Sequence, residues 1–107
     1  MTVYLFDLSG QWVAFRRTAT DKFLFNCDGE TIGWFPWGDE QSATIDGAYL
    51  GSVVGNRLVR NPRNAYRGYP GYPGYPGYPG YPGYPGFAGF AGYLPGYEDV
   101  PANLLRP

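Results

Sequence analysis

The sequence predicts an all-β head followed by an extended tail, and three observations lead to this fold class. An apolar pattern recurs three times within residues 1–60, around glycines spaced 19 and 18 residues apart. Valine, isoleucine and aromatic residues, which favour strands, flank each of these glycines. Six identical Gly-Tyr-Pro triplets then occupy residues 68–85. We therefore expect a small head of repeated β-hairpins, barrel- or rosette-like, followed by a polyproline II rod.

Each copy of the apolar pattern is typical of a β-hairpin. The segment VYLFDLSGQWVAFR (residues 3–16) aligns without gaps with KFLFNCDGETIGWF (residues 22–35), and SATIDGAYLGSVV (residues 42–54) is a third copy. An Asp-Gly or Ser-Gly pair supplies the positive φ that a tight hairpin turn requires. The predicted turn glycines are Gly10, Gly29 and Gly47. One hairpin cannot bury its own apolar face, so we expect the copies to pack around a shared core.

A fourth unit is only partly present, because GNRLVRN (residues 55–61) offers one closing strand and no partner. With this unit included, residues 1–60 resemble the four-fold β-flower domain family. The likeness is carried by YLFDLSGQWVAFR, FLFNCDGETIGWFPW and DGAYLGSVVGNRL. The resemblance implies hairpins arranged about a pseudo-four-fold axis, and it brings no catalytic residues with it.

The aromatic segment GWFPWGDE (residues 33–40) is a candidate docking surface. Adjacent side chains of a strand point to opposite faces, so Trp34, Phe35 and Trp37 cannot all lie in the core. One interpretation is an aromatic rim that covers a small core. The other is a groove for a proline-rich segment, because Trp- and Tyr-lined grooves bind polyproline II helices.

A basic linker covers residues 61–67, and the predicted rod covers residues 68–94, where two Gly-Phe-Ala triplets and Gly-Tyr-Leu follow the six strict repeats. Repeated type II turns and disorder are the alternatives for this tract. The three-residue turn of polyproline II places glycine, tyrosine and proline on three separate edges. The residues expected to pack rods together are Gly68, Tyr69, Pro70, Gly71, Tyr72, Pro73, Gly74, Tyr75, Pro76, Gly77, Tyr78, Pro79, Gly80, Tyr81, Pro82, Gly83, Tyr84 and Pro85.

A single rod buries almost no surface, so its order requires neighbours. Fixing one residue costs about 1–2 kcal/mol, and burying an aromatic side chain returns about 1.5–3 kcal/mol. At about 3.1 Å per residue, the 27 residues of the tract would extend for roughly 84 Å. Rod-to-rod hydrogen bonds between many copies would supply the remaining stabilisation.

Composition argues against catalysis and against most ligands. The chain has no histidine and a single cysteine, Cys27, so no disulfide and no Cys/His metal cluster can form within it. The acidic residues of the head lie mostly in turns, where they serve local hydrogen bonding. We expect no enzyme activity, no cofactor and no small-molecule substrate. The chain is acidic as a whole, with a net charge of −1, which disfavours nucleic acid as a partner.

These observations favour a structural protein that assembles with itself. Residues 1–50 carry a net charge of −4 and residues 51–68 a net charge of +4, which favours contact between copies. Identical contacts that do not close produce an open, helical filament or fibre. The alternative is a binding or adaptor module with a disordered, adhesive Gly-Tyr-Pro tail.

The two ends of the chain also lead to expectations about docking and location. Residues 95–107 form a C-terminal extension whose apolar residues Val100, Leu104 and Leu105 could dock on a head. Neither a secretory signal nor a transmembrane helix is visible in the sequence. We nevertheless favour an extracellular or cell-surface fibre, with the cytoplasm as the alternative location.

Overall fold

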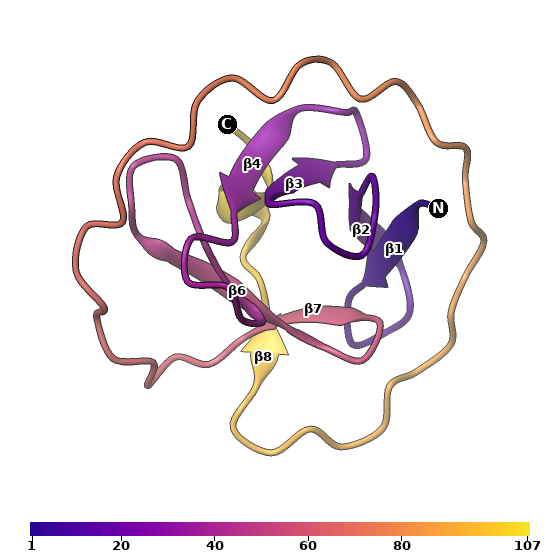
Figure 1. Cartoon of the computed structure of the whole chain (residues 1–107). Helices are drawn as coiled ribbons and strands as arrows, with labels where there is room; N and C mark the ends of the chain where they lie inside the picture. The colour runs from indigo at the N-terminus through magenta and orange to yellow at the C-terminus, as the bar shows by residue number, and fades with distance from the viewer.

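In a computed structural model that describes residues 1–107, seven strands form a closed barrel (Figure 1). Consecutive strands are antiparallel neighbours, and a parallel contact between Phe6 and Arg57 closes the barrel between its first and last strands. The strands are β1 (Val3–Phe6), β2 (Trp12–Arg16), β3 (Phe23–Asn26), β4 (Thr31–Trp34), β5 (Gln41–Ala43), β6 (Tyr49–Val54) and β7 (Arg57–Arg60). The all-β prediction is therefore confirmed, and the fold has no α-helix.

The three predicted hairpins are present, with their turns at the predicted glycines. Gly10, Gly29 and Gly47 have φ values of 102°, 81° and 92°, which L-amino acids with side chains rarely adopt. In each turn the glycine amide donates a hydrogen bond of 3.0–3.1 Å to the carbonyl three residues earlier. The hairpins also share an irregularity in the pairing of their first strand, directly before or at the residue where the turn begins. The internal repeat of the sequence is thus a repeat of backbone geometry.

One apolar side chain from each of six strands fills the barrel interior. Side chains alternate between the two faces of a strand, so these inward residues are separated by outward ones. The interior cluster consists of Leu5, Ala14, Leu24, Ile32, Leu50 and Leu58, joined by Phe35 and Val100. Arg16 lies at one end of this interior, where its guanidinium carbon is 4.0 Å from the centroid of the Phe35 ring.

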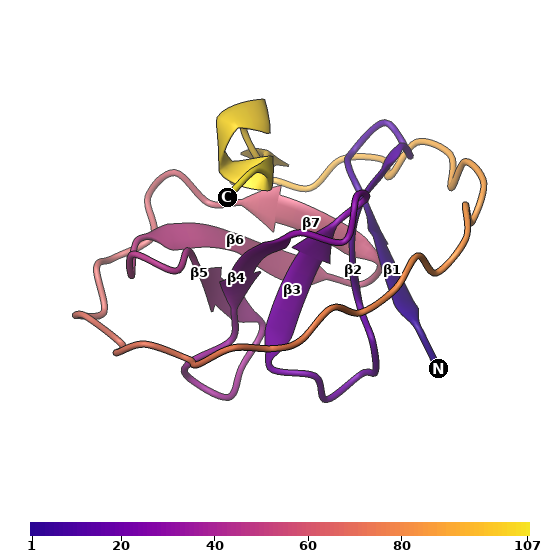
Figure 2. The same cartoon turned by 90° about the horizontal axis from the view of Figure 1, so that it is seen from above.

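A second apolar cluster lies on the outside of β2 to β5. Its members are Phe15, Phe23, Phe25, Trp34 and Ala43, and none is more than 9% exposed. The outer face of a small barrel normally meets water, so something must cover these rings. The repeat tract provides this cover, because it encircles the barrel on the outside of the strands (Figures 1 and 2).

The tract, residues 68–94, follows a curve around the barrel and not the straight rod that we expected. Its nine glycines have φ between 75° and 92°, whereas polyproline II requires φ near −75° throughout. A physical reason is that a straight rod on a single chain would bury nothing, whereas the curved tract places one edge against the barrel. The resulting molecule is a disc of 35 × 33 × 23 Å.

The C-terminal extension docks on its own barrel. Strand β8 (Glu98–Asp99) pairs antiparallel with β7, and Val100 is 7% exposed within the interior cluster. A 3-10 helix, η1 (Ala102–Leu105), places Leu104 and Leu105 against the same cluster. β7 and β8 therefore form a fourth antiparallel pair whose connection is the linker and the whole tract. No helix in the structure has the length and apolar composition needed to cross a bilayer.

Candidate functional site

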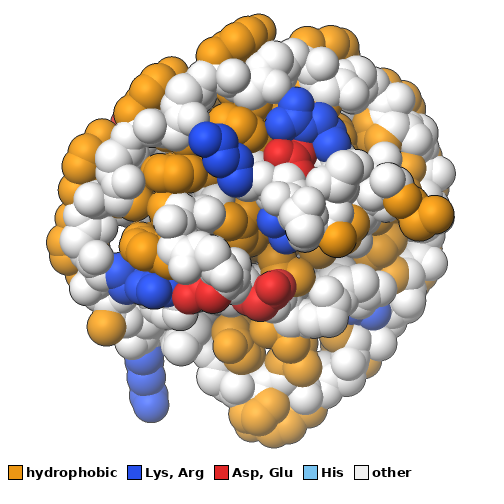
Figure 3. All heavy atoms as spheres, viewed as in Figure 1, with side chains coloured by type: hydrophobic (Ala, Val, Ile, Leu, Met, Phe, Trp, Pro, Cys, Tyr) orange, Lys and Arg blue, Asp and Glu red, His pale blue; other side chains and the backbone are white.

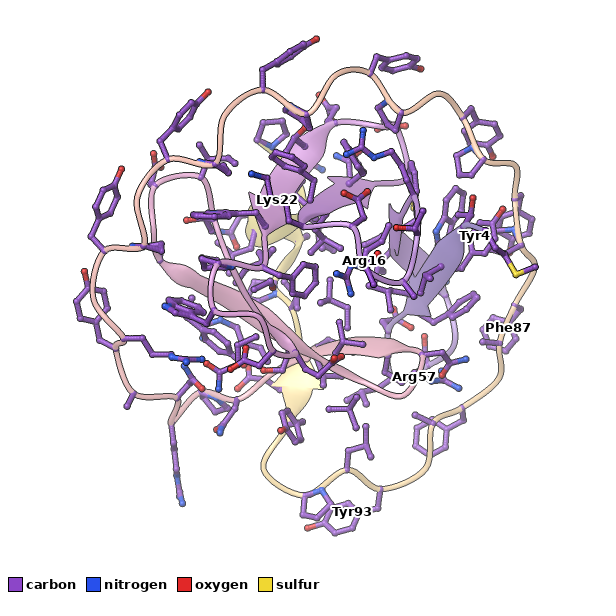
Figure 4. All side chains as sticks on the ribbon, viewed as in Figure 1. Tyr4, Arg16, Lys22, Arg57, Phe87 and Tyr93 are labelled. Carbon is purple, nitrogen blue, oxygen red and sulfur yellow. The ribbon has the colours of Figure 1, made fainter.

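The tract presents its aromatic rings to solvent at every third residue. Its nine aromatic side chains, from Tyr69 to Tyr93, are 64–87% exposed, and several rings of the tract project outward from the disc (Figure 4). The third residue of every triplet, proline, alanine or leucine, is buried or half-buried. Aromatic residues and third residues therefore differ in exposure along the tract, although the chain is curved and is not a polyproline II helix. Hydrophobic side chains consequently occupy the rim of the disc (Figure 3).

The hairpin turns of the barrel lie directly beneath the tract. A Cβ atom added to Gly47 would be 2.7 Å from Tyr69 Cδ1, and one added to Gly29 would be 3.3 Å from Tyr78 Cε1. Gly10 is in close backbone contact with Gly89. The tract thus passes the three turns in the reverse of their sequence order, advancing about three triplets from each turn to the next. The glycines allow close approach here as well as the positive φ of the turns.

Side chains of the barrel bind carbonyl groups of the tract. The Tyr4 hydroxyl donates to the Pro82 carbonyl at 2.8 Å, and Arg17 Nη1 donates to the Pro76 carbonyl at 2.8 Å. Trp12 lies next to two tract rings, with ring centroids 6.0 Å from Tyr81 and 6.1 Å from Tyr84. These contacts involve backbone oxygens and ring faces, which every Gly-Tyr-Pro triplet offers equally.

The two Gly-Phe-Ala triplets bind the barrel in a way that Gly-Tyr-Pro cannot. The Ala88 amide donates to the Gly10 carbonyl and the Ala91 amide donates to the Leu8 carbonyl, both at 2.8 Å. Proline has no amide hydrogen, so it could make neither bond. Arg57 Nη1 adds a bond of 2.7 Å to the Gly89 carbonyl. The change from proline to alanine thus coincides with the place where the tract is attached to the β1–β2 turn.

Arg67 attaches the beginning of the tract. Its Nη1 donates to Asp39 Oδ2 at 2.7 Å and to Gln41 Oε1 at 3.1 Å, and its guanidinium carbon lies 4.5 Å from the centroid of the Trp37 ring. The hydrogen bond from Arg67, followed by the one from the Gln41 amide, lowers the pKa of Asp39 below its ordinary value. A charged contact therefore fixes the linker to the loop that precedes β5.

A second ion pair supports the arginine that binds Pro76. Arg17 Nε donates to Asp21 Oδ2 at 2.7 Å. Burial acts to raise the pKa of Asp21, but hydrogen bonds from the Arg17 side chain and from the amides of Phe23 and Arg17 outweigh it, and the pKa is lowered. The hydrogen bond with Asp21 raises the pKa of Arg17. Arg17 therefore remains a cationic donor positioned towards the tract.

The structure does not bring the three predicted docking residues together on one surface. Phe35 belongs to the interior cluster and Trp34 to the outer cluster, while Trp37 is half-buried and packs beside the outer cluster. The opposite orientation of adjacent aromatics is as expected. Trp34 and Phe35 are buried and Trp37 is half-buried, so none of the three is fully exposed.

Cys27 shows no sign of reactivity. Burial, with a smaller contribution from the charge of Asp28, raises the pKa of its thiol to about 11. Its Sγ donates to the Trp12 carbonyl at 3.3 Å. The thiol therefore stays protonated at neutral pH, and no group of three or more His, Cys, Asp and Glu side chains is arranged to hold a metal ion.

Comparison with models of protein families, with curated proteins and with solved structures gave no match. What the tract and its attachment points can do is therefore inferred from the sequence and structure of this chain alone.

Several residues that contact the tract carry no signal in the sequence. Tyr4 is an ordinary strand residue of the first hairpin copy, Arg17 directly follows that copy, and Arg57 lies in the partial fourth unit. Ala88 and Ala91 do carry one, because they interrupt a strict repeat at the single position where proline removes a hydrogen-bond donor. That interruption reads as a weakening of the rod, whereas in the structure it marks an attachment point.

Proposed function

We propose that this is a structural protein that assembles with itself into filaments or fibres through its repeat tract. The observation that carries the proposal is the row of nine exposed aromatic rings around the rim of the disc. An aromatic side chain has a surface of about 150–250 Å², so the row presents on the order of 1,000 Å² to solvent. Soluble monomers seldom expose apolar patches larger than a few hundred Å² unless they bind something.

In the assembly we expect the tract to leave the barrel and to pack with other tracts as polyproline II rods. No backbone amide between Gly68 and Phe87 donates to a backbone carbonyl in the single chain. Glycine and tyrosine amides are therefore available to carbonyl groups of neighbouring rods, and the glycine edge allows rods to approach closely. The β heads would then decorate this common core.

Identical rods and identical heads make every copy equivalent, and contacts that do not close on themselves continue as an open helical array. The partner is thus a further copy of the same chain. The requirement for neighbours follows from the same comparison of chain entropy and burial that disfavours an isolated rod.

Electron microscopy of the purified protein at increasing concentration tests the proposal. We expect filaments, and a sample that contains only monodisperse single particles at high concentration would end the idea. A variant with serine in place of all six prolines of residues 68–85 tests the rod itself. We expect this variant to form no filaments, because serine does not preset φ as proline does. Normal filaments from it would refute the rod core.

A further inference from the structure

The last 22 residues form a docking unit that is separate from the Gly-Tyr-Pro section. We call residues 86–107 the C-terminal clasp and residues 68–85 the Gly-Tyr-Pro section. The clasp holds the barrel through the Ala88 and Ala91 amides, the Gly89 carbonyl, strand β8 and the buried side chain of Val100. Asp99 Oδ1 also accepts a bond of 2.8 Å from the Leu8 amide, and the Leu105 carbonyl one of 3.0 Å from Asn26 Nδ2.

The Gly-Tyr-Pro section is held much more weakly. It is attached by the two carbonyl bonds from Tyr4 and Arg17, together with ring and proline contacts. Its six triplets are identical, so no triplet is distinguished from the next by its side chains. The Gly-Tyr-Pro section thus connects the barrel to the specifically bound C-terminal clasp without holding either of them tightly. Such a connector permits the clasp to be exchanged between copies, as in domain swapping.

We propose that in the assembled state the clasp of one copy docks in the barrel of a neighbouring copy, in the place that its own clasp occupies in the single chain. This inference rests on the proposed filament function and names the contact that joins successive copies. The clasp contacts are the same in the closed and the exchanged form, so exchange changes the conformation of the Gly-Tyr-Pro section and removes its contacts with Tyr4, Arg17 and Trp12. Packing between neighbouring rods and heads must then cover the outer aromatic cluster.

The length of the connector is compatible with this exchange. As a polyproline II rod, 18 residues extend for roughly 56 Å, whereas the longest dimension of the whole molecule is 35 Å. A released section therefore reaches beyond its own barrel to the next one. It would run between heads as a rod, which is the role proposed for it in the filament core.

Exchange also predicts a dependence on concentration. A flexible connector gives the clasp an effective concentration of the order of millimolar at its own barrel. Dilute chains therefore remain closed, and exchange becomes competitive at high concentration or where neighbouring rods stabilise the open form. The closed disc is then the form of the subunit before assembly.

A mixing experiment with two cysteine variants tests the exchange. Arg60 and Glu98 are direct partners across β7 and β8, and the Cα atoms of such cross-strand partners lie within disulfide range. One preparation carries Arg60→Cys and the other Glu98→Cys, each with Cys27→Ser to remove the native thiol. After the two are mixed, assembled and oxidised, we expect a 60–98 disulfide between chains, seen at twice the chain mass and identified by peptide mass spectrometry.

A matched control replaces the Arg60→Cys partner with Thr18→Cys, which is exposed in the turn that follows β2. Filaments in which the 60–98 disulfide is no more abundant than the 18–98 disulfide would overturn the exchange and leave the filament proposal intact. If the wild type forms no filaments, the filament proposal fails, and the same disulfide is then sought in the concentrated soluble mixture. Its presence supports exchange and its absence overturns it.

A locked chain provides a second measurement. Arg60→Cys and Glu98→Cys combined in one chain, again with Cys27→Ser, form an internal disulfide that holds the clasp closed. We expect the oxidised, monomeric chain to form no filaments and to recover them when a reductant is added. Filament formation by the fully oxidised monomer would contradict the exchange, and urea unfolding confirms that the variant is folded.

Discussion

Ala88 and Ala91 are the two residues that attach the tract to the β1–β2 turn by main-chain hydrogen bonds. We expect the double variant Ala88→Pro/Ala91→Pro to lose both bonds and to leave the carbonyls of Gly10 and Leu8 without partners. A buried acceptor without a partner costs about 1–3 kcal/mol. Gly10 is buried and Leu8 is half-buried. The free energy of unfolding, measured with urea and tryptophan fluorescence, should therefore fall by about 1–3 kcal/mol for the Gly10 bond and by less for the Leu8 bond.

The control for this prediction is the reverse change at a neighbouring triplet. Pro85 occupies the same third position, but its nitrogen has no hydrogen to donate. Pro85→Ala should cost less than about 1 kcal/mol, which is the effect of greater freedom in the unfolded chain. Equal stability for the alanine-to-proline variant and the wild type would show that the two amide bonds contribute nothing.

The Asp39 carboxylate makes the start of the tract sensitive to acid. Its folded-state pKa is lowered by Arg67 and the Gln41 amide, so the contact stabilises the fold above the ordinary aspartate pKa of about 3.9 and is lost as the pH falls through the folded value. Protonation should release Arg67 from Asp39 and then from the Trp37 ring. We expect the NMR signal of the Trp37 indole to shift with a midpoint below pH 3.9.

Replacing Arg67 separates this effect from a general acid transition. In Arg67→Gln the main cause of the lowered pKa is absent, so the carboxyl of Asp39 should titrate closer to its ordinary value. An unchanged midpoint in this variant would mean that Arg67 does not hold the carboxylate in solution.

At the scale of elements, the sequence predicts what is local and misses what is distant. The hairpin turns at Gly10, Gly29 and Gly47 are readable because a turn glycine and its flanking strands lie within one short segment. β7 is readable as a strand without a partner. Its partner β8 has two residues, too few for any periodicity, and lies 37 residues further along the chain. The pairing of β7 with β8 depends on contacts between distant parts of the chain, so no short segment of the sequence predicts it.

The tract illustrates the same limit in another form. Its three-residue period correctly separates outward rings from inward prolines, because this depends only on the repeat. Whether the chain is straight or curved depends on glycine, which adopts φ of either sign at little cost. The outer cluster of Phe15, Phe23 and Phe25 favours the curved form in the single chain, and a repeat considered alone contains no information about that surface.

At the scale of the whole molecule, the tract covers the outer face of the barrel, and we expect its length to be matched to the path that it follows. The contacts with Gly47 and Gly10 lie 20 residues apart on the tract, at Tyr69 and Gly89. Deleting three triplets, residues 77–85, leaves these two residues eleven positions apart, and a fully extended chain of that length reaches at most about 40 Å. We expect the shortened tract to lose at least one turn and to uncover the outer aromatic cluster, detected as binding of a hydrophobic dye and a lower urea midpoint.

Inserting three further Gly-Tyr-Pro triplets should have a much smaller effect. Extra residues can form an outward loop, and lengthening a loop by a third costs less than about 0.5 kcal/mol. Dye binding and the urea midpoint should therefore stay near those of the wild type. A deletion and an insertion with equal effects would show that the length of the tract is not matched to the barrel.

If the shortened tract behaves as expected, the path around the barrel requires a minimum number of triplets. The tract is made of whole triplets, so the gain or loss of one triplet changes its length without shifting the pattern. Copies with too few triplets would expose their aromatic surface and be removed by aggregation or proteolysis, whereas longer copies would be tolerated. We therefore expect natural variants of this chain to carry additional triplets far more often than missing ones.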